Sequence, residues 1–299
     1  MNDKPSISAI VISYHGMEFV PDCLKTLAEN LKGYDNEIIV IDNHSTDGTV
    51  EFIEENYPAI KLIKNRTNAG FAKAVNQGLQ ITDNDYVWIL NQDIRISNGC
   101  LNSLIACYEQ LPNPGMIGPR LVGFDGKLQR FCRRFPRYHH LLFELIGLSF
   151  LFPDSKLFNG WKMGDFDHCH SRSVPQPMGA AMLLKRECIN NIGLMDESFG
   201  IFFNDVDYCE RLEIAGYRNY YCCEAVLEHY QGGSVSRQKP KMVWLSHGGM
   251  FKYFVKYEKR RRSGRFSRII RLPLSLIAGL LLFISAIPRS VYHWLRKFI

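Results

Sequence analysis

The pattern of apolar and polar positions divides the first hundred residues into alternating strands and helices. Short apolar runs, typical of buried strands, occupy residues 7–13, 37–41, 60–63 and 86–90. Apolar residues at helical spacing between these runs predict helices over residues 18–31, 49–56 and 69–81. Repeated strand–helix units of this length predict a parallel, doubly wound α/β sheet with right-handed crossovers.

The fourth apolar run stops at the polar triplet Asn91-Gln92-Asp93. Its unbroken apolar character favours a strand that is buried on both faces, as in a parallel sheet. Polar residues at the carboxyl end of such a strand lie where open α/β sheets bind ligands, so Asp93 could hold a divalent cation against a diphosphate. The alternative is that Asp93 only begins a turn or caps a helix predicted over residues 98–111.

Polar residues also follow the first two strands, as Ser13-Tyr14 and Asp42-Asn43. The carboxyl ends of parallel strands meet at one edge of the sheet, where these side chains could bind and cover a pyrimidine base. Each pair taken singly could equally be a turn former. The chain lacks the GxGxxG and GxxxxGK[ST] patterns, which argues against dinucleotide and P-loop sites.

The second half of the chain has a less regular pattern. Strands are predicted over residues 117–122, 177–184 and 218–223, and a helix over residues 208–215. Small residues around Gly179 indicate backbone that lies close to a ligand, although close packing of a strand on a helix would also explain them. Arginines and aromatic residues are mixed over residues 130–138. This patch could bind a lipid-linked diphosphate acceptor or form a solvated helix face.

Charge is distributed unevenly along the chain, whose net charge is +6. Residues 1–240 hold 23 Lys or Arg and 29 Asp or Glu, hence −6, whereas residues 241–299 hold 13 and one, hence +12. The acidic body argues against a nucleic-acid partner. The basic cluster and the apolar run over residues 272–287 predict that residues 252–299 bind an anionic membrane surface. The alternative is an amphipathic helix packed on the body.

Cysteine usage indicates a reducing compartment. The nine cysteines are scattered, odd in number and without any CxxC pair, which favours free cytosolic thiols over a disulfide framework. The first residues show no signal-peptide pattern.

Several motifs, in this order, resemble family 2 glycosyltransferases of the GT-A fold, and in particular the rhamnosyltransferase-like enzymes of bacterial surface polysaccharides. The motifs occupy residues 10–14, 41–48, 68–72 with 76–78, and 90–93. The resemblance covers roughly residues 6–235. It implies a Rossmann-like mixed sheet flanked by helices, with a catalytic domain over 1–240 that divides into a nucleotide-binding half, 1–97, and an acceptor half, 98–240. A membrane-associating helical tail would follow over 241–299.

The resemblance also assigns roles to individual residues. It implies a Mg²⁺ or Mn²⁺ cofactor held by Asp93 and His229, with Asp205 and Asp207 in the catalytic motif. Asp205 is expected to be the general base, because it would precede the helix while Asp207 would cap the helix's first turn. The expected nucleotide-sugar-binding residues are Ser13, Tyr14, Asp42, Asn43, Ser45, Asn68, Gly70, Asn76, Asn91 and Gly179.

Two positions depart from the family pattern: Asn91 stands where the first Asp of Asp-x-Asp is usual, and Asn204 stands where a Glu is usual. The expected function is inverting transfer of a sugar from a nucleotide-sugar to a saccharide or lipid-linked acceptor in the synthesis of a polysaccharide such as O-antigen. The preferred donor is dTDP-rhamnose, because of the resemblance. The expected location is the cytoplasmic face of the inner membrane, with the protein peripheral or C-terminally anchored. The alternative is a protein that binds nucleotide-sugars without turnover, or a scaffold of an assembly complex, which the two asparagines would support.

Overall fold

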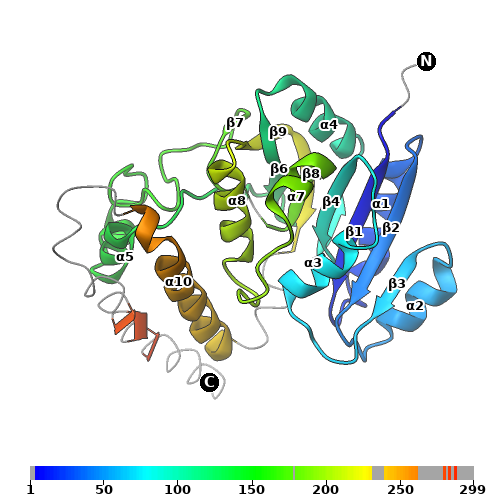
Figure 1. Cartoon of the computed structure of the whole chain (residues 1–299), viewed down its shortest axis with the longest axis horizontal. Coiled ribbons are helices and arrows are strands. Elements are labelled where there is room, and N and C mark those ends of the chain that lie inside the picture. Colours follow the sequence, from blue (N-terminus) through cyan, green and yellow to red (C-terminus); the bar gives the residue numbers. More distant parts are fainter. Residues whose placement is uncertain are drawn as a thin grey trace.

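The fold is an α/β arrangement in which helices cover both faces of a nine-stranded mixed sheet (Figure 1). The computed structural model describes residues 4–177, 179–230 and 239–261, and the pairs 279–280, 282–283 and 286–287. The strands are β1 (Ile7–Ser13), β2 (Asn36–Asp42), β3 (Lys61–Lys64), β4 (Tyr86–Asn91), β5 (Ile94–Ile96), β6 (Pro114–Val122), β7 (Arg172–Ser173), β8 (Ala181–Lys185) and β9 (Arg218–His229). The helices are α1 (Val20–Leu31), α2 (Thr49–Asn56), α3 (Phe71–Leu79), α4 (Cys100–Gln110), α5 (Tyr138–Leu145), α6 (Leu148–Leu151), α7 (Arg186–Ile192), α8 (Asn204–Ile214) and α10 (Lys239–Arg261).

The sheet has the order β3-β2-β1-β4-β8-β6-β9-β5, with β7 also paired to β9. The first four strands of this order are mutually parallel, as the sequence pattern predicts. Beyond β4 the sheet is mixed, as the resemblance implies, because β8 pairs antiparallel to both β4 and β6. The connection from β6 to β8 runs through α5 and α6 to one side of the sheet rather than through a helix that crosses it (Figure 1).

Alternation of side chains along the central strands produces two apolar layers. Ala9 and Val11 of β1 belong to the layer under α1, α2 and α4, whereas Ile10 and Ile12 face α3, α7 and α8. Successive side chains of a strand point to opposite faces, so an unbroken apolar run fills both layers. This explains why the first, second and fourth strands were visible in the sequence.

Two of the boundaries that differ from the prediction bear on the site. Helix α8 begins at Asn204, four residues earlier than predicted, so both aspartates lie inside its first turn. Phe203 has a left-handed backbone (φ 70°), and the Asn204 side chain accepts a hydrogen bond from the Asp205 N–H, which together start the helix there. Strand β9 continues to His229, past the predicted end at residue 223, so His229 is the last residue of a strand.

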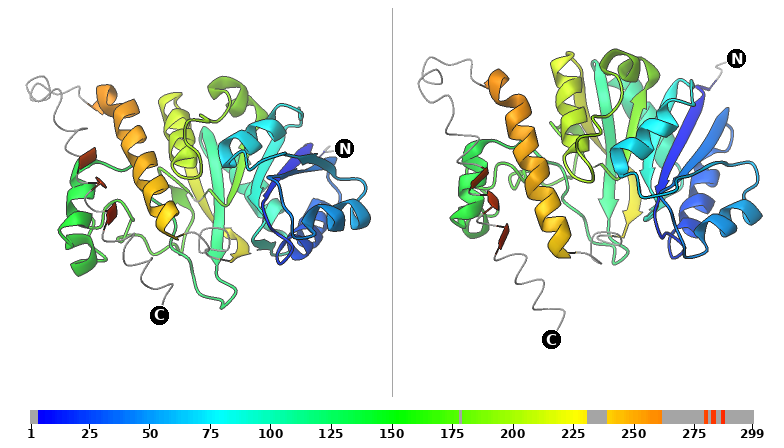
Figure 2. Two further views of the ribbon diagram at one scale, coloured as in Figure 1. Left: turned by 90° about the horizontal axis from the view of Figure 1, so that it is seen from below. Right: turned by 60° about the horizontal axis from the view of Figure 1, so that its bottom comes forward.

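The C-terminal region begins with a helix that packs on the α/β body. The aromatic face of α10 (Tyr253, Phe254 and Tyr257) is buried in one apolar cluster with Phe203 and Val206. Figure 2 shows α10 beside α8 in both views. In the described ranges, no helix has the length and apolar character needed to span a bilayer. Most of the predicted membrane-binding segment lies outside the described residues.

Candidate active site

Gln92 joins the carboxyl ends of the two central strands. Its side-chain oxygen accepts hydrogen bonds from the Ser13 hydroxyl and the Tyr14 N–H, both at 2.8 Å, and its amide donates to the Tyr14 carbonyl at 2.9 Å. A Cβ on Gly16 would lie 2.1 Å from the Gln92 oxygen, so only glycine fits at that position. The predicted residue Ser13 therefore supports the loop after β1, and Tyr14 is held at its surface.

Asp42 is buried at the end of β2 with one oxygen unsatisfied. Its Oδ2 accepts from the Ser45 N–H at 2.8 Å, while Oδ1 has no hydrogen-bond partner. The Ser45 hydroxyl in turn accepts from the His15 N–H, which joins this loop to the loop after β1. Buried polar atoms are normally paired, so the unpaired Oδ1 is a candidate acceptor for a donor from outside the protein.

Asn43 and the loop before α3 lie at the same edge of the sheet, beyond the carboxyl end of β2. The Asn43 Oδ1 accepts from the Ala69 N–H at 3.3 Å, and Asn68 Oδ1 accepts from the Gly70 N–H at 2.9 Å. Gly70 has φ 82°, which favours glycine, and a Cβ there would lie 3.6 Å from the Gly200 carbonyl oxygen. This loop therefore lies against the segment that leads into α8.

The structure does not bring Asn76 together with the other predicted binding residues. This side chain is buried in α3, where it accepts from the Met195 N–H and donates to the Met195 carbonyl and to Glu197. All of its polar atoms are thus used to hold the loop before α8.

Asp93 and His229 are brought together by the pairing of β5 with β9. Ile94 lies opposite His229 in the ladder, and the Tyr230 N–H donates to the Asp93 carbonyl at 2.9 Å. The His229 Nε2 then lies 3.7 Å from the Asp93 Oδ1. Gln129 fixes the orientation of the imidazole on the side away from Asp93. The Gln129 Nε2 donates to the His229 carbonyl, and the Gln129 Oε1 lies 3.0 Å from the His229 Nδ1. Nδ1 is therefore the protonated nitrogen, and the Nε2 lone pair is directed at Asp93.

Burial gives this pair the electrostatics of a cation site. Burial raises the pKa of Asp93 to about 6 and lowers the pKa of His229 to about 4, so the imidazole is neutral at pH 7. Asp93 has no ion-pair partner in the described ranges other than this neutral imidazole. Two ligands of one divalent cation lie roughly 3–4 Å apart, and a carboxylate with an imidazole is a suitable donor set. The two side chains therefore fit a divalent metal.

Asp205 lies in the first turn of α8 against a glycine and a glutamine. Gln176 donates to its Oδ2 at 2.8 Å, and a Cβ on Gly179 would lie 2.7 Å from the same oxygen. Gly179 thus leaves the space that the carboxylate occupies. Burial raises the pKa of Asp205, and the hydrogen bond from Gln176 opposes that shift. A carboxylate held in this way can accept a proton at its other oxygen.

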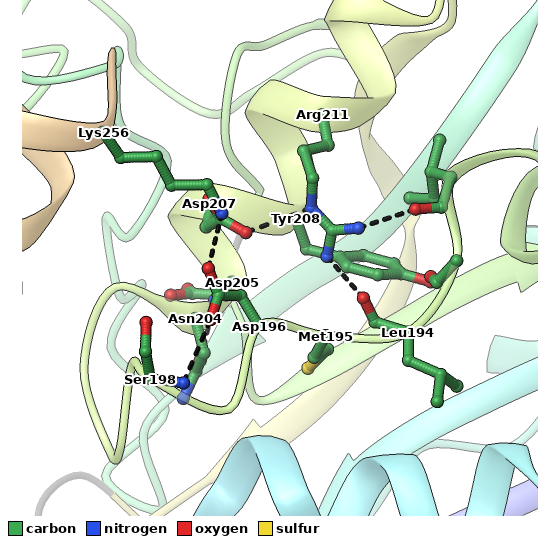
Figure 3. A network of polar contacts seen from close by, with 12 residues as sticks. Leu194, Met195, Asp196, Ser198, Asn204, Asp205, Asp207, Tyr208, Arg211 and Lys256 are labelled. Carbon is green, nitrogen blue, oxygen red and sulfur yellow. Dashed lines mark hydrogen bonds and ion pairs between the residues drawn. The ribbon is translucent and has the colours of Figure 1, made fainter. Parts of the chain in front are cut away.

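Asp207, the second aspartate of the motif, is fully buried in a polar network (Figure 3). The Arg211 Nε lies 3.0 Å from Oδ2, and the Lys256 Nζ lies 2.7 Å from Oδ1. The Tyr257 hydroxyl also donates to Oδ1 at 2.7 Å. Lys256 pairs with Asp196 as well, so the network ties α8, α10 and the loop before α8 into one unit. Asp207 thus ties these elements together, and its carboxylate oxygens are already bonded.

Replacing Asp207 with asparagine is expected to lower the free energy of unfolding by about 3 kcal/mol, because the change leaves Arg211 without its carboxylate partner and removes one of the two held by Lys256. Urea unfolding monitored by circular dichroism measures the effect. The matched control is Asp154→Asn, at an exposed pair 4.0 Å from Arg130, which should change stability by less than about 1 kcal/mol. Equal effects of the two changes would contradict the network's structural role.

A backbone hydrogen bond joins the segment that leads to Asp93 to the segment that lies beside Asp205. The Asn91 N–H at the end of β4 donates to the Ala180 carbonyl at 2.9 Å. Ala180 follows Gly179, which touches Asp205, and Asn91 lies two residues before Asp93. The backbone of Arg133 is also paired with Gln176, the partner of Asp205. The segments that carry the candidate base and the candidate metal ligand Asp93 are thus joined at the end of β4.

The basic-aromatic patch over residues 130–138 does not form the helix face that was one interpretation of its sequence. Residues 130–137 are non-helical, and α5 begins at Tyr138. Arg134 makes a two-point ion pair with Asp165 at 2.8 Å. Arg133, in contrast, is half-buried and has no carboxylate partner in the part of the chain that the structure describes; its guanidinium donates to backbone carbonyls.

Three glutamines of the site, Gln92, Gln129 and Gln176, were not among the predicted binding residues. Gln92 could have been found, since it lies within the polar triplet after the fourth strand. Gln129 contacts His229, 100 residues later in the sequence, and Gln176 contacts Asp205, 29 residues later. The residues near each glutamine in the sequence give no sign of these contacts.

The sequence is similar to those of known glycosyltransferases. The model of the family described as Glycosyl transferase family 2 matches residues 8–169. N-acetylglucosaminyl-diphospho-decaprenol L-rhamnosyltransferase of Mycobacterium tuberculosis is 25% identical over 221 residues, which cover 70% of this chain and 71% of the relative. The low-salt glycan biosynthesis hexosyltransferase Agl10 of Haloferax volcanii is 23% identical over 209 residues, covering 69% and 61%.

Solved structures share the fold. The mannosyltransferase PcManGT of Pyrobaculum calidifontis, in complex with GDP-Man and Mn²⁺, superposes with a TM-score of 0.57 at 18% identity, covering 98% of this chain and 74% of the other. GalNAc-T7 with UDP, GalNAc and Mn²⁺ superposes with a TM-score of 0.61 at 14% identity, covering 85% and 48%. These likenesses confirm a GT-A-like α/β fold with a mixed sheet.

Proposed function

Since the chain belongs to glycosyltransferase family 2, we propose that it is a metal-dependent enzyme that transfers a sugar from a nucleotide-sugar with inversion at the anomeric carbon. The observation that carries this proposal is the backbone hydrogen bond from Asn91 to Ala180, which joins the segment leading to Asp93, the partner of His229, to the glycine beside Asp205. A base and a charge-stabilising centre on opposite sides of the donor sugar are what a direct displacement requires.

Asp205 would act as the general base. The acceptor hydroxyl gives its proton to the Asp205 carboxylate as its oxygen forms a bond to the anomeric carbon. The bond from that carbon to the diphosphate breaks, and its electron pair leaves with the diphosphate. Gln176 orients the carboxylate by donating to Oδ2, and Gly179 keeps space beside it.

Asp93 and His229 would hold Mg²⁺ or Mn²⁺. When bound, the cation supplies positive charge for the leaving diphosphate. Both structural neighbours described above carry Mn²⁺ in their complexes, which supports a divalent ion in the proposed role. Asn91 offers only a neutral oxygen, so the proposed metal affinity rests mainly on the other two side chains.

The loops after β1 and β2 would bind the nucleotide. Asp42 Oδ1, which has no partner within the protein, would accept the ring N–H of a pyrimidine base. Tyr14 would cover the base, and Asn43 with the loop of Asn68 and Gly70 would bound the pocket.

The donor in this proposal is dTDP-rhamnose, and the acceptor is a saccharide carried on a lipid diphosphate in cell-surface polysaccharide synthesis. The mycobacterial relative supports this choice through its name alone. Arg133 is the residue we assign to the acceptor diphosphate, because its guanidinium lacks a carboxylate partner in the described ranges and its backbone is paired with Gln176, the partner of the base.

The membrane tail remains part of the proposal. Lys252 donates to the Ser198 carbonyl and Lys256 pairs with two aspartates of the body, so these two charges serve the fold. The basic residues from position 259 onward would bind anionic lipid at the cytoplasmic face of the inner membrane.

A non-catalytic nucleotide-sugar-binding protein is the second candidate, favoured by the two asparagines. The Asn204 amide is used to bond the Gly200 and Ile201 carbonyls, so this residue has a structural role and offers no charge. Incubation of purified protein with dTDP-, UDP- and GDP-sugars and Mn²⁺ tests the choice. Release of nucleoside diphosphate supports the enzyme, whereas thermal stabilisation by a donor without any turnover supports the binding protein.

Replacing Gln129 with leucine is expected to raise the Mn²⁺ concentration needed for half-maximal activity about 10- to 100-fold, because the imidazole loses the acceptor that fixes its tautomer. Calorimetric titration of Mn²⁺ provides a readout that does not depend on turnover. The control is Lys127→Leu, two residues away with an exposed side chain, which should leave both measurements unchanged. A Gln129 variant with wild-type Mn²⁺ affinity would contradict the assigned role.

A further inference from the structure

The region between β6 and β7 exposes a group of large apolar side chains on and after helices α5 and α6. The group comprises Leu142, Ile146, Phe150, Leu151, Phe152 and Leu157. Phe150 is 84% exposed and Leu151 is 65% exposed, although both lie in a helix. Contiguous exposed apolar surface of this kind marks an interaction site.

The local structure explains why these side chains cannot turn inward. The inner face of α5 already contributes Leu141 to the apolar cluster with α10. Gly147, with φ 79°, ends α5 and starts α6 as a separate single turn. The sequence is apolar on both faces here, so whichever face packs inward, the other stays exposed.

A second segment extends the same surface. Leu282 is buried in the cluster with Leu141, whereas Leu280 and Phe283 beside it are exposed. The Phe283 ring lies 5.3 Å from that of Trp244 in α10, which is itself partly exposed. Both views of Figure 2 show these helical residues next to α5, at the end of the molecule away from β3. Exposed apolar residues from distant parts of the sequence thus gather at one end.

The same segment of the chain carries exposed basic residues. They include Arg130, Arg137 and Lys156. Residues 130–162 contain six Lys or Arg and only two acidic residues, and both acidic residues are paired: Glu144 with Lys162, and Asp154 with Arg130. Exposed apolar and basic side chains on one segment match an interface of acyl chains and anionic headgroups.

We propose that this surface, called here the α5–α6 surface, inserts its apolar side chains into the interfacial region of an anionic lipid bilayer. The contact adjoins the one assigned to the C-terminal tail, whose Leu280 and Phe283 extend the same surface. The segment that carries it also supplies Arg133, whose backbone pairs with Gln176, so docking would turn the acceptor side of the site toward the bilayer. That last consequence rests on the proposed function, while the bilayer contact does not.

Insertion can be measured on the full chain with a tryptophan probe. Phe150→Trp is compared with Ile81→Trp, at an isoleucine that is 45% exposed after α3. The vesicles contain phosphatidylcholine and phosphatidylglycerol in equal parts, with or without bromine on the acyl chains. The expected result is that brominated lipid quenches the added fluorescence of Phe150→Trp and not that of Ile81→Trp. Equal quenching of the two, with the protein bound to vesicles, would overturn the proposal.

Affinity gives an independent measurement. The double change Phe150→Ser with Leu151→Ser is expected to weaken vesicle binding about tenfold, while Ile81→Ser with Ile214→Ser, at apolar positions that are 45% and 47% exposed, leaves it unchanged. Nucleoside diphosphate release from a soluble donor should be equal in both variants, which separates this result from failure of the proposed function. If the Phe150→Trp emission instead shifts with protein concentration in the absence of lipid, a second copy of the chain covers the surface and the proposal is wrong.

Discussion

Replacing Asp205 with asparagine is expected to lower kcat by about 100- to 10,000-fold, which is the usual contribution of a general base. Asparagine keeps the size of the side chain and can still bond Gln176 and fit beside Gly179, so the donor should bind as before. Stopped assays of sugar transfer and calorimetric titration of the donor measure the two effects separately.

The pH dependence of the wild-type protein should agree with this role. Burial raises the pKa of Asp205 above the ordinary value for aspartate, and a base must be ionised to accept a proton. The value of kcat/KM should therefore fall as the pH is lowered through that raised pKa. Transfer by Asp205→Asn at a rate near that of the wild type would show that another group is the base.

Loss of a residue that is hydrogen-bonded to a metal ligand typically lowers metal affinity roughly 10- to 100-fold. Replacing Asp93, which is itself a proposed ligand, with asparagine is expected to raise the Mn²⁺ requirement by more than that. The free energy of unfolding of the metal-free protein should stay the same or increase. The reason is that the change removes a buried carboxylate whose only ion-pair partner in the described ranges is a neutral imidazole.

His229→Ala is the companion to this experiment, since it removes the second proposed ligand while leaving Asp93 in place. Mn²⁺ titration calorimetry and thermal unfolding in the presence of a chelator are the measurements. A large loss of stability in the chelated Asp93→Asn protein, with Mn²⁺ affinity retained, would mean that the pair is structural.

The sequence predicted the strands of the first hundred residues well because their signals are local. The strands β1, β2 and β4 are buried on both faces, so each appears as an apolar run, and each ends in polar residues that the sheet places at one edge. Asp42 and Asp93 could be selected from the sequence for that reason. Asn76 lies in the same region but bonds Met195, 119 residues away, and its local pattern could not show this.

The second half of the chain was harder to predict, because long-range contacts determine its strand directions and helix boundaries. The direction of β8 depends on its pairing with β4, about 90 residues earlier in the chain, and an apolar run carries no information about direction. The start of α8 depends on the left-handed backbone of Phe203 and on the side-chain bonds of Asn204. The role of Asp207 depends on Lys256 and Tyr257, which belong to a helix that the charge pattern assigned to a tail.

The most direct test of the account is the metal dependence and stereochemistry of turnover. Purified full-length protein would be given dTDP-rhamnose and a lipid-diphosphate-linked N-acetylglucosamine acceptor. The account predicts transfer with Mn²⁺, loss of transfer on chelation, recovery when Mn²⁺ is restored, and a product whose anomeric configuration, determined by NMR, is opposite to that of the donor. Transfer at the same rate in excess chelator, or a product with the donor's configuration, would contradict it.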